Sequence, residues 1–308
     1  DRERAVIGAI MQHVEPAGIH SGDSASMIPA MGISMKMHKE ITRASKELAR
    51  RLNVCGLMNI QFAVKDEQLY VIEVNPRASR TVPFVSKAIG KPLAKMAAQI
   101  MAGKTLAELG FTQEITPEYH CVKEAVFPWG RFPGIDVVLG PEMKSTGEVM
   151  GIDPDPDIAF AKSQVSAFNP LPTEGKVFIS VNDRDKERVL HMARQLADMG
   201  FTLCATRGTM IHLLQHDIEC ERAYKVNEAR RPNIVDHIKN GDIDFIINTP
   251  GSHDARADDI IIRSSAIAAK TSYCTNLASA QACVNAIEAL KNRNLQVCTI
   301  QEYHAQTL

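Results

Sequence analysis

Two apolar segments flanking a polar turn predict a β-hairpin between residues 58 and 75. Segments 58–64 and 69–75 are rich in β-branched and aromatic residues, whereas Lys65–Gln68 is polar, and this pattern is typical of paired strands. If Gln61 pairs with Glu73, alternation places six large side chains on one face: Ile60, Phe62, Val64, Tyr70, Ile72 and Val74. The other face then carries Gln61, Ala63, Val71, Glu73 and Asn75. A slip of one residue would mix the two sets, so the burial pattern favours this register.

The second face of this hairpin offers oxygen ligands for a metal ion. They are one carboxylate and two amides: Glu73, Gln61 and Asn75. Magnesium takes oxygen ligands, typically one or two carboxylates with substrate phosphates and water. Arg77 and Arg80 follow and supply fixed positive charge for phosphoryl oxygens, and metal ions with arginines are what phosphoryl transfer requires. The alternative is a solvated hairpin with two surface arginines. The combined spacing, the register and Pro76 after the second strand favour a magnesium–phosphate site.

Three longer runs in the chain resemble one family. They are EVNPRASRTVPFVSK at residues 73–87, HSGDS at residues 20–24 and GPEMKSTGE at residues 140–148. They closely resemble the C-terminal part of the large subunit of carbamoyl-phosphate synthetase, and the resemblance covers essentially all 308 residues. It implies an ATP-grasp fold that uses ATP and Mg²⁺ or Mn²⁺, with K⁺ as a further candidate. The residues matching the family's site are the metal ligands Gln61, Glu73 and Asn75, the catalytic arginines Arg77 and Arg80, and the nucleotide-contacting His20.

The family's large subunit carries two ATP-grasp units, of which the first forms carboxyphosphate and the second phosphorylates carbamate. This chain has one Glu-x-Asn-Pro-Arg motif followed by a different domain, and Thr81–Phe84 follows the arginines, as in the second unit. The resemblance therefore implies that carbamate and ATP give carbamoyl phosphate and ADP, for pyrimidine and arginine biosynthesis. No glycine-rich phosphate loop precedes Asp1, so we expect a fragment that does not turn over alone.

The resemblance also implies partners for the intact enzyme: a glutamine-amidotransferase small subunit, the remainder of the large subunit, and further copies in an oligomer. Composition narrows the other classes of partner. The net charge of −1 gives no general electrostatic case for binding nucleic acid or an anionic membrane. No apolar run approaches the length of a membrane span. Seven scattered cysteines without a C-x-x-C pair indicate reduced thiols and a cytoplasmic protein.

The fold class expected is α/β in two domains. Residues 1–170 are expected to form an α+β lobe, the C-terminal part of the ATP-grasp domain. Besides the hairpin, the patterns predict strands at 6–14 and 121–127, loops from there to 151, and helices at 34–52, 93–101 and 105–109. The polar, proline-containing stretch Asn169–Gly175 is the predicted linker.

Residues 171–308 alternate between strand and helix patterns. The predicted strands are 176–181, 201–205, 245–248, 271–274 and 297–300. The predicted helices are 185–199, 209–216, 233–240, 258–269 and 278–290. Such alternation favours a doubly wound layer around a parallel sheet. The resemblance agrees, because the synthetase ends in an allosteric domain similar to methylglyoxal synthase.

A second candidate site lies where strands of this domain end. Thr206–Thr209 follows a predicted strand and opens a helix, and ligands of open α/β sheets bind beyond the carboxyl ends of the strands. By resemblance, the pocket for the phosphate of UMP or IMP consists of Lys186, Thr206, Thr209, Lys225 and Asn248. Pro250 stands where the family commonly has threonine. The alternative is that Thr206 and Thr209 only cap the helix.

A third candidate site contains acidic residues at the boundary between the domains. By resemblance, the residues that would bind ornithine are Glu15, Asp23, Glu124 and Thr275. Clustered carboxylates suit an amine ligand. The alternative for each of them is a surface carboxylate or a helix-capping group.

Three other functions compete with the leading one. A carboxylase such as biotin carboxylase also uses Glu-x-Asn-x-Arg, but its arginine precedes a Gln-Val-Glu-His run, whereas Ala78–Val82 stands here. The C-terminal domain could instead be a lyase that makes methylglyoxal from a triose phosphate. The third alternative is a nucleotide-sensing module without turnover.

Overall fold

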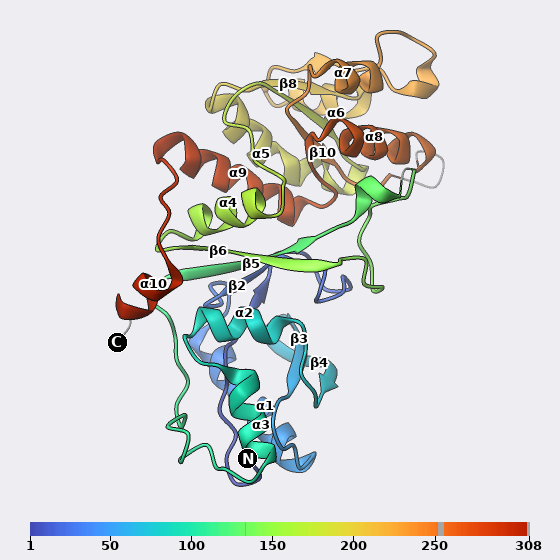
Figure 1. Ribbon diagram of the computed structural model, residues 1–308. Helices are drawn as coiled ribbons and strands as arrows, with labels where there is room; N and C mark the ends of the chain where they lie inside the picture. Colours follow the sequence, from blue (N-terminus) through green and yellow to red (C-terminus); the bar gives the residue numbers. More distant parts are fainter. Residues whose placement is uncertain (133, 252–255, 307–308) are drawn as a thin grey trace.

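The computed structural model describes residues 1–132, 134–251 and 256–306 (Figure 1). Its N-terminal and C-terminal parts lie at opposite ends of the molecule, and the long strands β5 and β6 run between them. The fold class predicted from sequence is confirmed: antiparallel sheets form the first part, and one five-stranded parallel sheet forms the second.

Helices α1 (Met35–Arg51), α2 (Thr81–Ala88) and α3 (Leu93–Met101) form most of the N-terminal end. The first and third agree with the predicted helices. The hydroxyl of Ser34 accepts a hydrogen bond from the Met37 N–H at 3.2 Å and so caps α1. Apolar side chains from α2 and α3 pack into a small core with Phe111 and Tyr119. The predicted helix at 105–109 is wrong, because these residues form turns that end in the left-handed Gly110.

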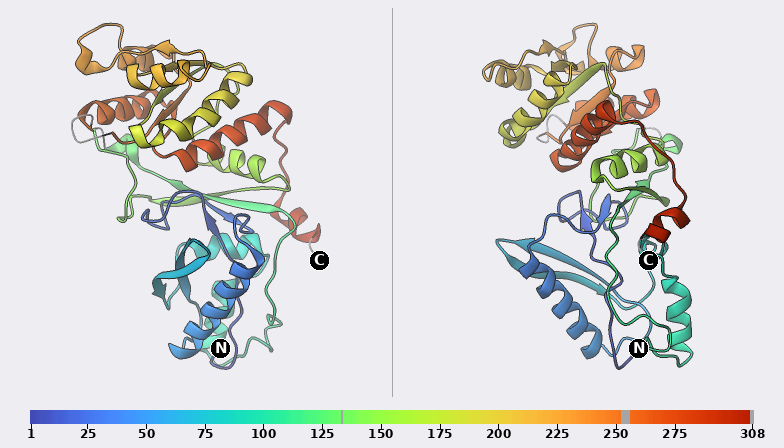
Figure 2. Two further views of the ribbon diagram at one scale, coloured as in Figure 1. Left: turned by 180° about the vertical axis from the view of Figure 1, so that it is seen from behind. Right: turned by 90° about the vertical axis from the view of Figure 1, so that its left-hand side faces the viewer.

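The predicted hairpin is present as β3 (Asn59–Lys65) and β4 (Gln68–Asn75), and Gln61 pairs with Glu73 as expected. Beyond that pair the register shifts, because Phe62 pairs with Val71 and Ile72 is the extra residue of a β-bulge. The predicted apolar face is therefore wrong toward the turn. About half of each of the side chains of Tyr70, Val71 and Ile72 is exposed. Figure 2 shows the hairpin beside α1, away from the C-terminal part.

A four-stranded antiparallel sheet forms the middle of the molecule in the order β1-β2-β5-β6. Its strands are Gln12–His13, Ser26–Ile28, His120–Val126 and Gly147–Asp153. Between β5 and β6 lies the short helix η1 (Trp129–Arg131). Two expectations are wrong here: only the end of the predicted strand 6–14 is a strand, and β6 occupies residues expected to be loop. Residues 6–11 line a cavity instead of pairing.

Helix α4 (Pro156–Ser166) covers this sheet and begins at Asp155, whose carboxylate accepts hydrogen bonds from the N–H groups of Asp157 and Ile158. The chain then passes through residues 169–175 without regular structure. Phe160 of α4 and Val122 of β5 belong to the same apolar core as the C-terminal sheet. The two parts of the molecule therefore share one core.

The parallel sheet has the strand order β11-β10-β7-β8-β9. In chain order its strands are β7 (Lys176–Ser180), β8 (Thr202–Ala205), β9 (Glu221–Arg222), β10 (Phe245–Asn248) and β11 (Ser272–Cys274). The helices are η2 (Asp183–Asp185), α5 (Lys186–Asp198), α6 (Arg207–Leu214), η3 (Val226–Glu228), α7 (Ile234–Asn240), α8 (Arg256–Ala269) and α9 (Leu277–Asn292).

Alternate residues of β7 show why this sheet is doubly wound. Val177 and Ile179 pack into the core with α5 and α9, whereas Phe178 packs into the other core with α7 and α8. All three side chains are fully buried, as expected for a parallel strand covered on both faces.

The chain ends at the other domain. The predicted strand at 297–300 is wrong: residues 293–299 have no regular structure, and α10 (Ile300–Gln306) follows. Helix α10 lies beside the N-terminal part (Figure 1), where the Tyr303 hydroxyl donates to the Ile152 carbonyl at 3.2 Å. Across residues 1–132, 134–251 and 256–306, no helix has the length and apolar character needed to cross a membrane.

Candidate functional site

The hairpin brings four oxygen-bearing side chains to one face at its base. Gln61 lies opposite Glu73, and Asn59 lies opposite Asn75. Because directly paired residues of antiparallel strands share a face, the three predicted metal ligands lie together there. Asn59 is a fourth oxygen donor that the sequence analysis missed, although its pairing with Asn75 follows from the predicted register. One carboxylate and three amide oxygens suit Mg²⁺ or Mn²⁺.

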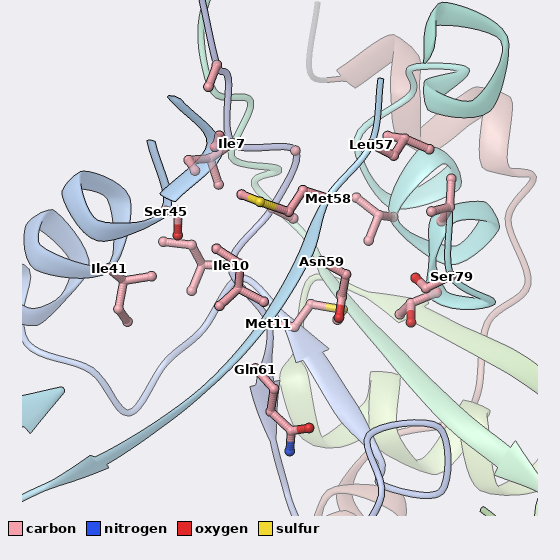
Figure 3. A pocket seen from close by; sticks show the side chains of 18 of the residues that line it. Ile7, Ile10, Met11, Ile41, Ser45, Leu57, Met58, Asn59, Gln61 and Ser79 are labelled. Carbon is pink, nitrogen blue, oxygen red and sulfur yellow. The ribbon is translucent and has the colours of Figure 1, made fainter. Parts of the chain in front are cut away.

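A cavity of about 540 Å³ lies beside this face, between residues 4–13, α1, β3 and the start of α2 (Figure 3). Its walls are largely apolar, with Ile7, Ile10 and Met58 among them. Asn59 and Gln61 from β3 and Ser79 from the segment before α2 contribute polar groups. A mostly apolar cavity with a few polar groups is typical of a small-molecule site.

The two predicted catalytic arginines have different surroundings. Arg77 lines the cavity, is exposed, and donates one hydrogen bond to the carbonyl of its neighbour Ala78 at 3.1 Å. Arg80 instead binds Ser145, donating to its hydroxyl at 2.7 Å and its carbonyl at 3.3 Å. Arg77 is therefore the arginine free to meet a ligand, whereas Arg80 holds the 140–146 loop.

His20 and Arg80 converge on Gly22. A Cβ atom at this position would lie 2.9 Å from Arg80 Nη2 and 3.2 Å from His20 Nδ1, so a side chain there would displace the Arg80 guanidinium. His20 Nδ1 accepts the Gly22 N–H at 3.0 Å, and the His20 N–H donates to the Gly140 carbonyl at 2.8 Å. The runs 20–24 and 140–148, far apart in sequence, therefore form one structure around Arg80.

Asp23 joins the same two loops. Its carboxylate oxygens accept the N–H groups of Lys144 at 2.8 Å and Ser145 at 3.0 Å, and the side chain is 1% exposed. A carboxylate whose two oxygens both accept main-chain N–H groups stabilises the conformation of the loop that donates them. This geometry differs from the ornithine-binding role that the resemblance implies for Asp23.

Glu15 and Glu124 meet where the two parts of the molecule join. Glu15 accepts hydrogen bonds from the Ala25 N–H at 2.7 Å and the Ser279 hydroxyl at 2.8 Å, and Ser279 lies on α9 in the C-terminal part. Glu124 accepts one from Gln164 Nε2 at 2.6 Å. Ser279 and Gln164 were not predicted, and no local sequence motif marks them. Thr275 lies in the turn that leads into α9.

Burial changes the ionisation of this cluster. Burial, with repulsion from Glu15 as a second cause, raises the pKa of Glu124 to about 8, and burial also raises the pKa of Glu15. Lys123 is fully buried, and this burial lowers the pKa of its ammonium group. Lys123 donates to the carbonyls of Ser21 at 3.0 Å and Gly22 at 3.4 Å. Two partly buried carboxyl groups with raised pKa values would each gain stability in the charged form from a second cation beside them.

The second candidate site lies at the carboxyl ends of β7, β8 and β10. The Thr206 hydroxyl is 3.3 Å from the Ser180 hydroxyl, and the Thr209 hydroxyl is 3.4 Å from the Val181 N–H. Both threonines are buried. Thr206 is the N-cap residue of α6, but its side chain makes no capping hydrogen bond. The capping alternative therefore fails for the Thr206 hydroxyl.

The other predicted pocket residues fall into two groups. Lys186 reaches the start of α6, because its Nζ would lie 3.3 Å from a Cβ at Gly208, and it also pairs with Asp183 at 2.7 Å. Lys225 lies in the segment after β9, near Ala223, whose N–H donates to the Ala205 carbonyl at 2.8 Å. Asn248 is 1% exposed, and its side chain is held from several sides. It donates to Ser180 O and Asp259 Oδ1 and accepts from Arg263 Nη1.

Arg263 connects this pocket to the N-terminal part. Its guanidinium donates to Asn248 Oδ1 at 2.8 Å and pairs with Asp136 Oδ1 at 2.9 Å, and the side chain is 1% exposed. Asp136 belongs to the segment that Lys144 holds, because Lys144 Nζ donates to the carbonyls of Asp136 and Val138. A continuous series of hydrogen bonds thus runs from Asn248 to the loop around Arg80. The sequence analysis missed Asp136 and Arg263.

Known proteins match both parts of the chain. A family model described as "Carbamoyl-phosphate synthase L chain, ATP binding domain" matches residues 1–109, and one described as "MGS-like domain" matches residues 188–275. The carbamoyl phosphate synthase large chain of Archaeoglobus fulgidus is 50% identical over 308 residues, which is all of this chain and 28% of that protein. The large chain of Pasteurella multocida is 51% identical over 309 residues, again all of this chain and 29% of that protein.

Solved structures give weaker likenesses. The biotin carboxylase domain of a single-chain bacterial carboxylase is 19% identical with a TM-score of 0.37, and the match covers 47% of this chain and 39% of that one. A methylglyoxal synthase from Elizabethkingia anophelis is 17% identical with a TM-score of 0.32, covering 37% of this chain and 79% of that one. Such TM-scores carry no argument about the fold.

The curated relatives decide the family, although the chain spans only about 28% of their length. Both family models and the full-length identity point the same way. This chain belongs to the carbamoyl phosphate synthase large chain family and corresponds to its C-terminal part, with an ATP-grasp ATP-binding domain followed by an MGS-like domain.

Proposed function

We propose that this chain supplies the metal-binding half of a carbamate-phosphorylating site, in which carbamate and ATP give carbamoyl phosphate and ADP. The observation that carries the proposal is the pairing of Gln61 with Glu73 beside a cavity that Arg77 lines. Gln61, Glu73 and Asn75 would hold Mg²⁺ or Mn²⁺, which neutralises charge on the phosphates when bound. Arg77 would meet the transferred phosphoryl group, while Arg80 and His20 hold the neighbouring loops.

The intact large chain is the right material for testing this role. Arg77→Ala should lower the rate of carbamoyl phosphate formation by about a hundredfold or more, since a charged donor to the transferred group is lost. Arg50→Ala is the matched control, because Arg50 is an exposed arginine on α1 paired with Glu47. Equal rates in both variants would remove Arg77 from the site.

We also propose that the C-terminal part is a nucleotide receptor for UMP or IMP. The phosphate would contact Lys186, Thr206, Thr209 and Lys225. Asn248 would hold the strand ends that form the pocket in place. Calorimetric titration of this chain with UMP, then IMP, tests it directly. Thr209→Val should abolish saturable binding, whereas the control Thr202→Val on β8 should keep it. If the folded wild-type chain binds neither nucleotide, the receptor proposal fails.

Ornithine is the proposed ligand of Glu15 and Glu124, together with Thr275 from the turn before α9. An ammonium group beside Glu124 favours its charged form and so lowers its pKa. Binding at pH 7 should therefore release protons, which titrations in two buffers of different ionisation enthalpy would detect. The absence of any buffer dependence would contradict an amine at these carboxyl groups.

The broader assignments rest on the family and remain proposals. Residues 1–170 would work in phosphorylation and residues 171–308 in control, within a cytoplasmic oligomer that contains the rest of the large chain and a glutamine-amidotransferase small subunit. K⁺ stays a proposed additional cofactor. The alternative is that this chain, taken alone, is a nucleotide-sensing module without turnover, which predicts that it binds the nucleotide but forms no carbamoyl phosphate by itself. The curated relatives favour the synthase over a biotin carboxylase.

A further inference from the structure

Two histidines and one glutamate meet on the outer side of α5 and α6. His212 lies on α6, His216 lies one helical turn later, and Glu187 lies in the first turn of α5. The ligand atoms of the three side chains all lie within 4.8 Å of one another. The three side chains come from α5, from α6 and from the turn that follows α6, so the backbone fixes where each of them starts. Both histidines fall on the helix predicted at 209–216, and the sequence analysis gave them no role.

The hydrogen bonding of both rings leaves nitrogen atoms for a ligand. His216 Nδ1 is 2.9 Å from the His212 carbonyl, which can only accept, so Nδ1 carries the proton and Nε2 keeps its lone pair. A metal-binding histidine typically donates its other ring nitrogen to a carbonyl in this way. His212 Nε2 is buried without a hydrogen-bond partner, although Glu187 Oε1 is 3.2 Å away. An imidazole nitrogen and a carboxylate oxygen this close together are a pair that one metal ion can bind.

We propose that Glu187, His212 and His216 form a binding site for a divalent transition-metal ion of the zinc class. Two imidazoles and one carboxylate are a common ligand set for Zn²⁺, with water in the fourth position. Imidazole ligands disfavour Mg²⁺, which prefers oxygen. The site is therefore chemically distinct from the oxygen-rich hairpin face at Gln61 and Glu73.

The position of this site gives it a structural consequence. Glu187 directly follows Lys186, and His212 lies one turn after Thr209 on α6. A bound ion would connect the start of α5 to the middle of α6. These two elements carry the lysine and the threonine of the proposed phosphate pocket. Metal binding itself does not depend on the nucleotide proposal, because it is measured with no nucleotide present.

The test is a titration of this chain with Zn²⁺ in competition with a chromophoric chelator at pH 7.5, under reducing conditions. The wild-type chain should bind one ion at this site. Glu187→Gln, His212→Gln and His216→Ala should each weaken that binding at least about tenfold. His237→Gln on α7 is the control and should bind like the wild type. Glu187 is exposed, so its substitution leaves the fold intact even if a histidine variant unfolds.

Two results would overturn the proposal. The first is a folded wild-type chain that competes for no Zn²⁺. The second is binding that all three ligand variants retain at wild-type affinity, which would assign the ion to other side chains such as the free cysteines. Thermal unfolding gives a second readout, because a ligand that binds only the folded state raises the transition temperature. That rise should disappear in Glu187→Gln and persist in His237→Gln.

Discussion

Glu124 shows how folding can change the chemistry of a single side chain. The carboxyl group is partly buried at the junction of the two parts and is repelled by a second partly buried carboxyl group, Glu15. Its neighbour Lys123 offsets part of the cost, but burial remains the largest cause of the raised pKa. The junction therefore holds a protonated Glu124 carboxyl group at neutral pH, which a cationic ligand beside it would favour in its ionised form.

The pH dependence of stability follows from the raised pKa of Glu124. The pKa of Glu124 is about 8 in the folded protein, and its ordinary value is 4.5. The contribution of this group to the free energy of unfolding is therefore fully present below pH 4.5 and is lost as pH rises through 8. Glu124→Gln stays neutral. We expect the free energy of unfolding of this variant, relative to wild type, to increase between pH 5 and 8.5 in urea titrations. A difference that does not change with pH would contradict the assignment, and exposed Glu118→Gln is the control.

Some residues of the candidate sites could be predicted from sequence and others could not. The pairing of Gln61 with Glu73 was predictable because strand alternation acts locally. The tertiary fold alone brings Glu15 to Ser279, and Asp136 to Arg263. The spacing of these residues in the chain therefore does not predict either contact. Arg80 and Asp23 lie inside recognisable motifs, but their hydrogen bonds to the 140–146 loop could not be predicted from the sequence.

At the scale of elements, only half of the hairpin follows the register that the burial pattern predicts. The base of the hairpin follows the predicted register, whereas the bulge at Ile72 shifts the outer half. Both sides of that half are partly exposed, so no buried face selects the register there. Residues 297–300 do not form the predicted strand for a related reason, since Val297 is 98% exposed and packs against no buried face. The Thr299 and Glu302 side chains bond each other's main-chain N–H groups, a capping box that the sequence did contain.

The contact of β6 with α4 makes Gly151 irreplaceable. A Cβ atom there would collide with the Ala159 carbonyl oxygen and the Ser163 amide nitrogen of the helix. Gly151→Ala must separate the two elements, so we expect a loss of about 1–3 kcal/mol or more in the free energy of unfolding. Gly140→Ala is the control, because a Cβ atom at Gly140 meets nothing within 4 Å. Equal stabilities of the two variants would refute this packing.

At the scale of the whole molecule, hydrogen bonds connect the proposed nucleotide pocket with the N-terminal part. Arg263 spans the junction between Asn248 of that pocket and Asp136, and Lys144 Nζ, next to the Ser145 that binds Arg80, holds the segment of Asp136. Residues of both parts also belong to one apolar core at this junction. If nucleotide binding alters MgATP affinity, the reverse effect must be equal in size.

Breaking this junction should uncouple the sites. In the intact enzyme, Asp136→Asn weakens the pair with the buried Arg263, so we expect most of the effect of MgATP on nucleotide affinity to disappear. Typical couplings of about 1–3 kcal/mol are measurable by titration with and without MgATP. Asp153→Asn is the matched control, because Asp153 pairs with Lys162 within the first part at 2.7 Å. Full coupling in Asp136→Asn would show that the connection lies elsewhere.

The most direct test of the account is Glu73→Gln in the intact large chain, with Asp66→Asn in the same hairpin as its control. Glu73 is the one carboxylate among the three predicted metal ligands, and it is exposed, so stability should change by less than about 0.5 kcal/mol. We predict that Mg²⁺-dependent formation of ATP from carbamoyl phosphate and ADP falls by on the order of a hundredfold or more in Glu73→Gln, while Asp66→Asn keeps the wild-type rate. A near-normal rate in a folded Glu73→Gln enzyme would contradict the metal site, and with it the proposed role of the hairpin.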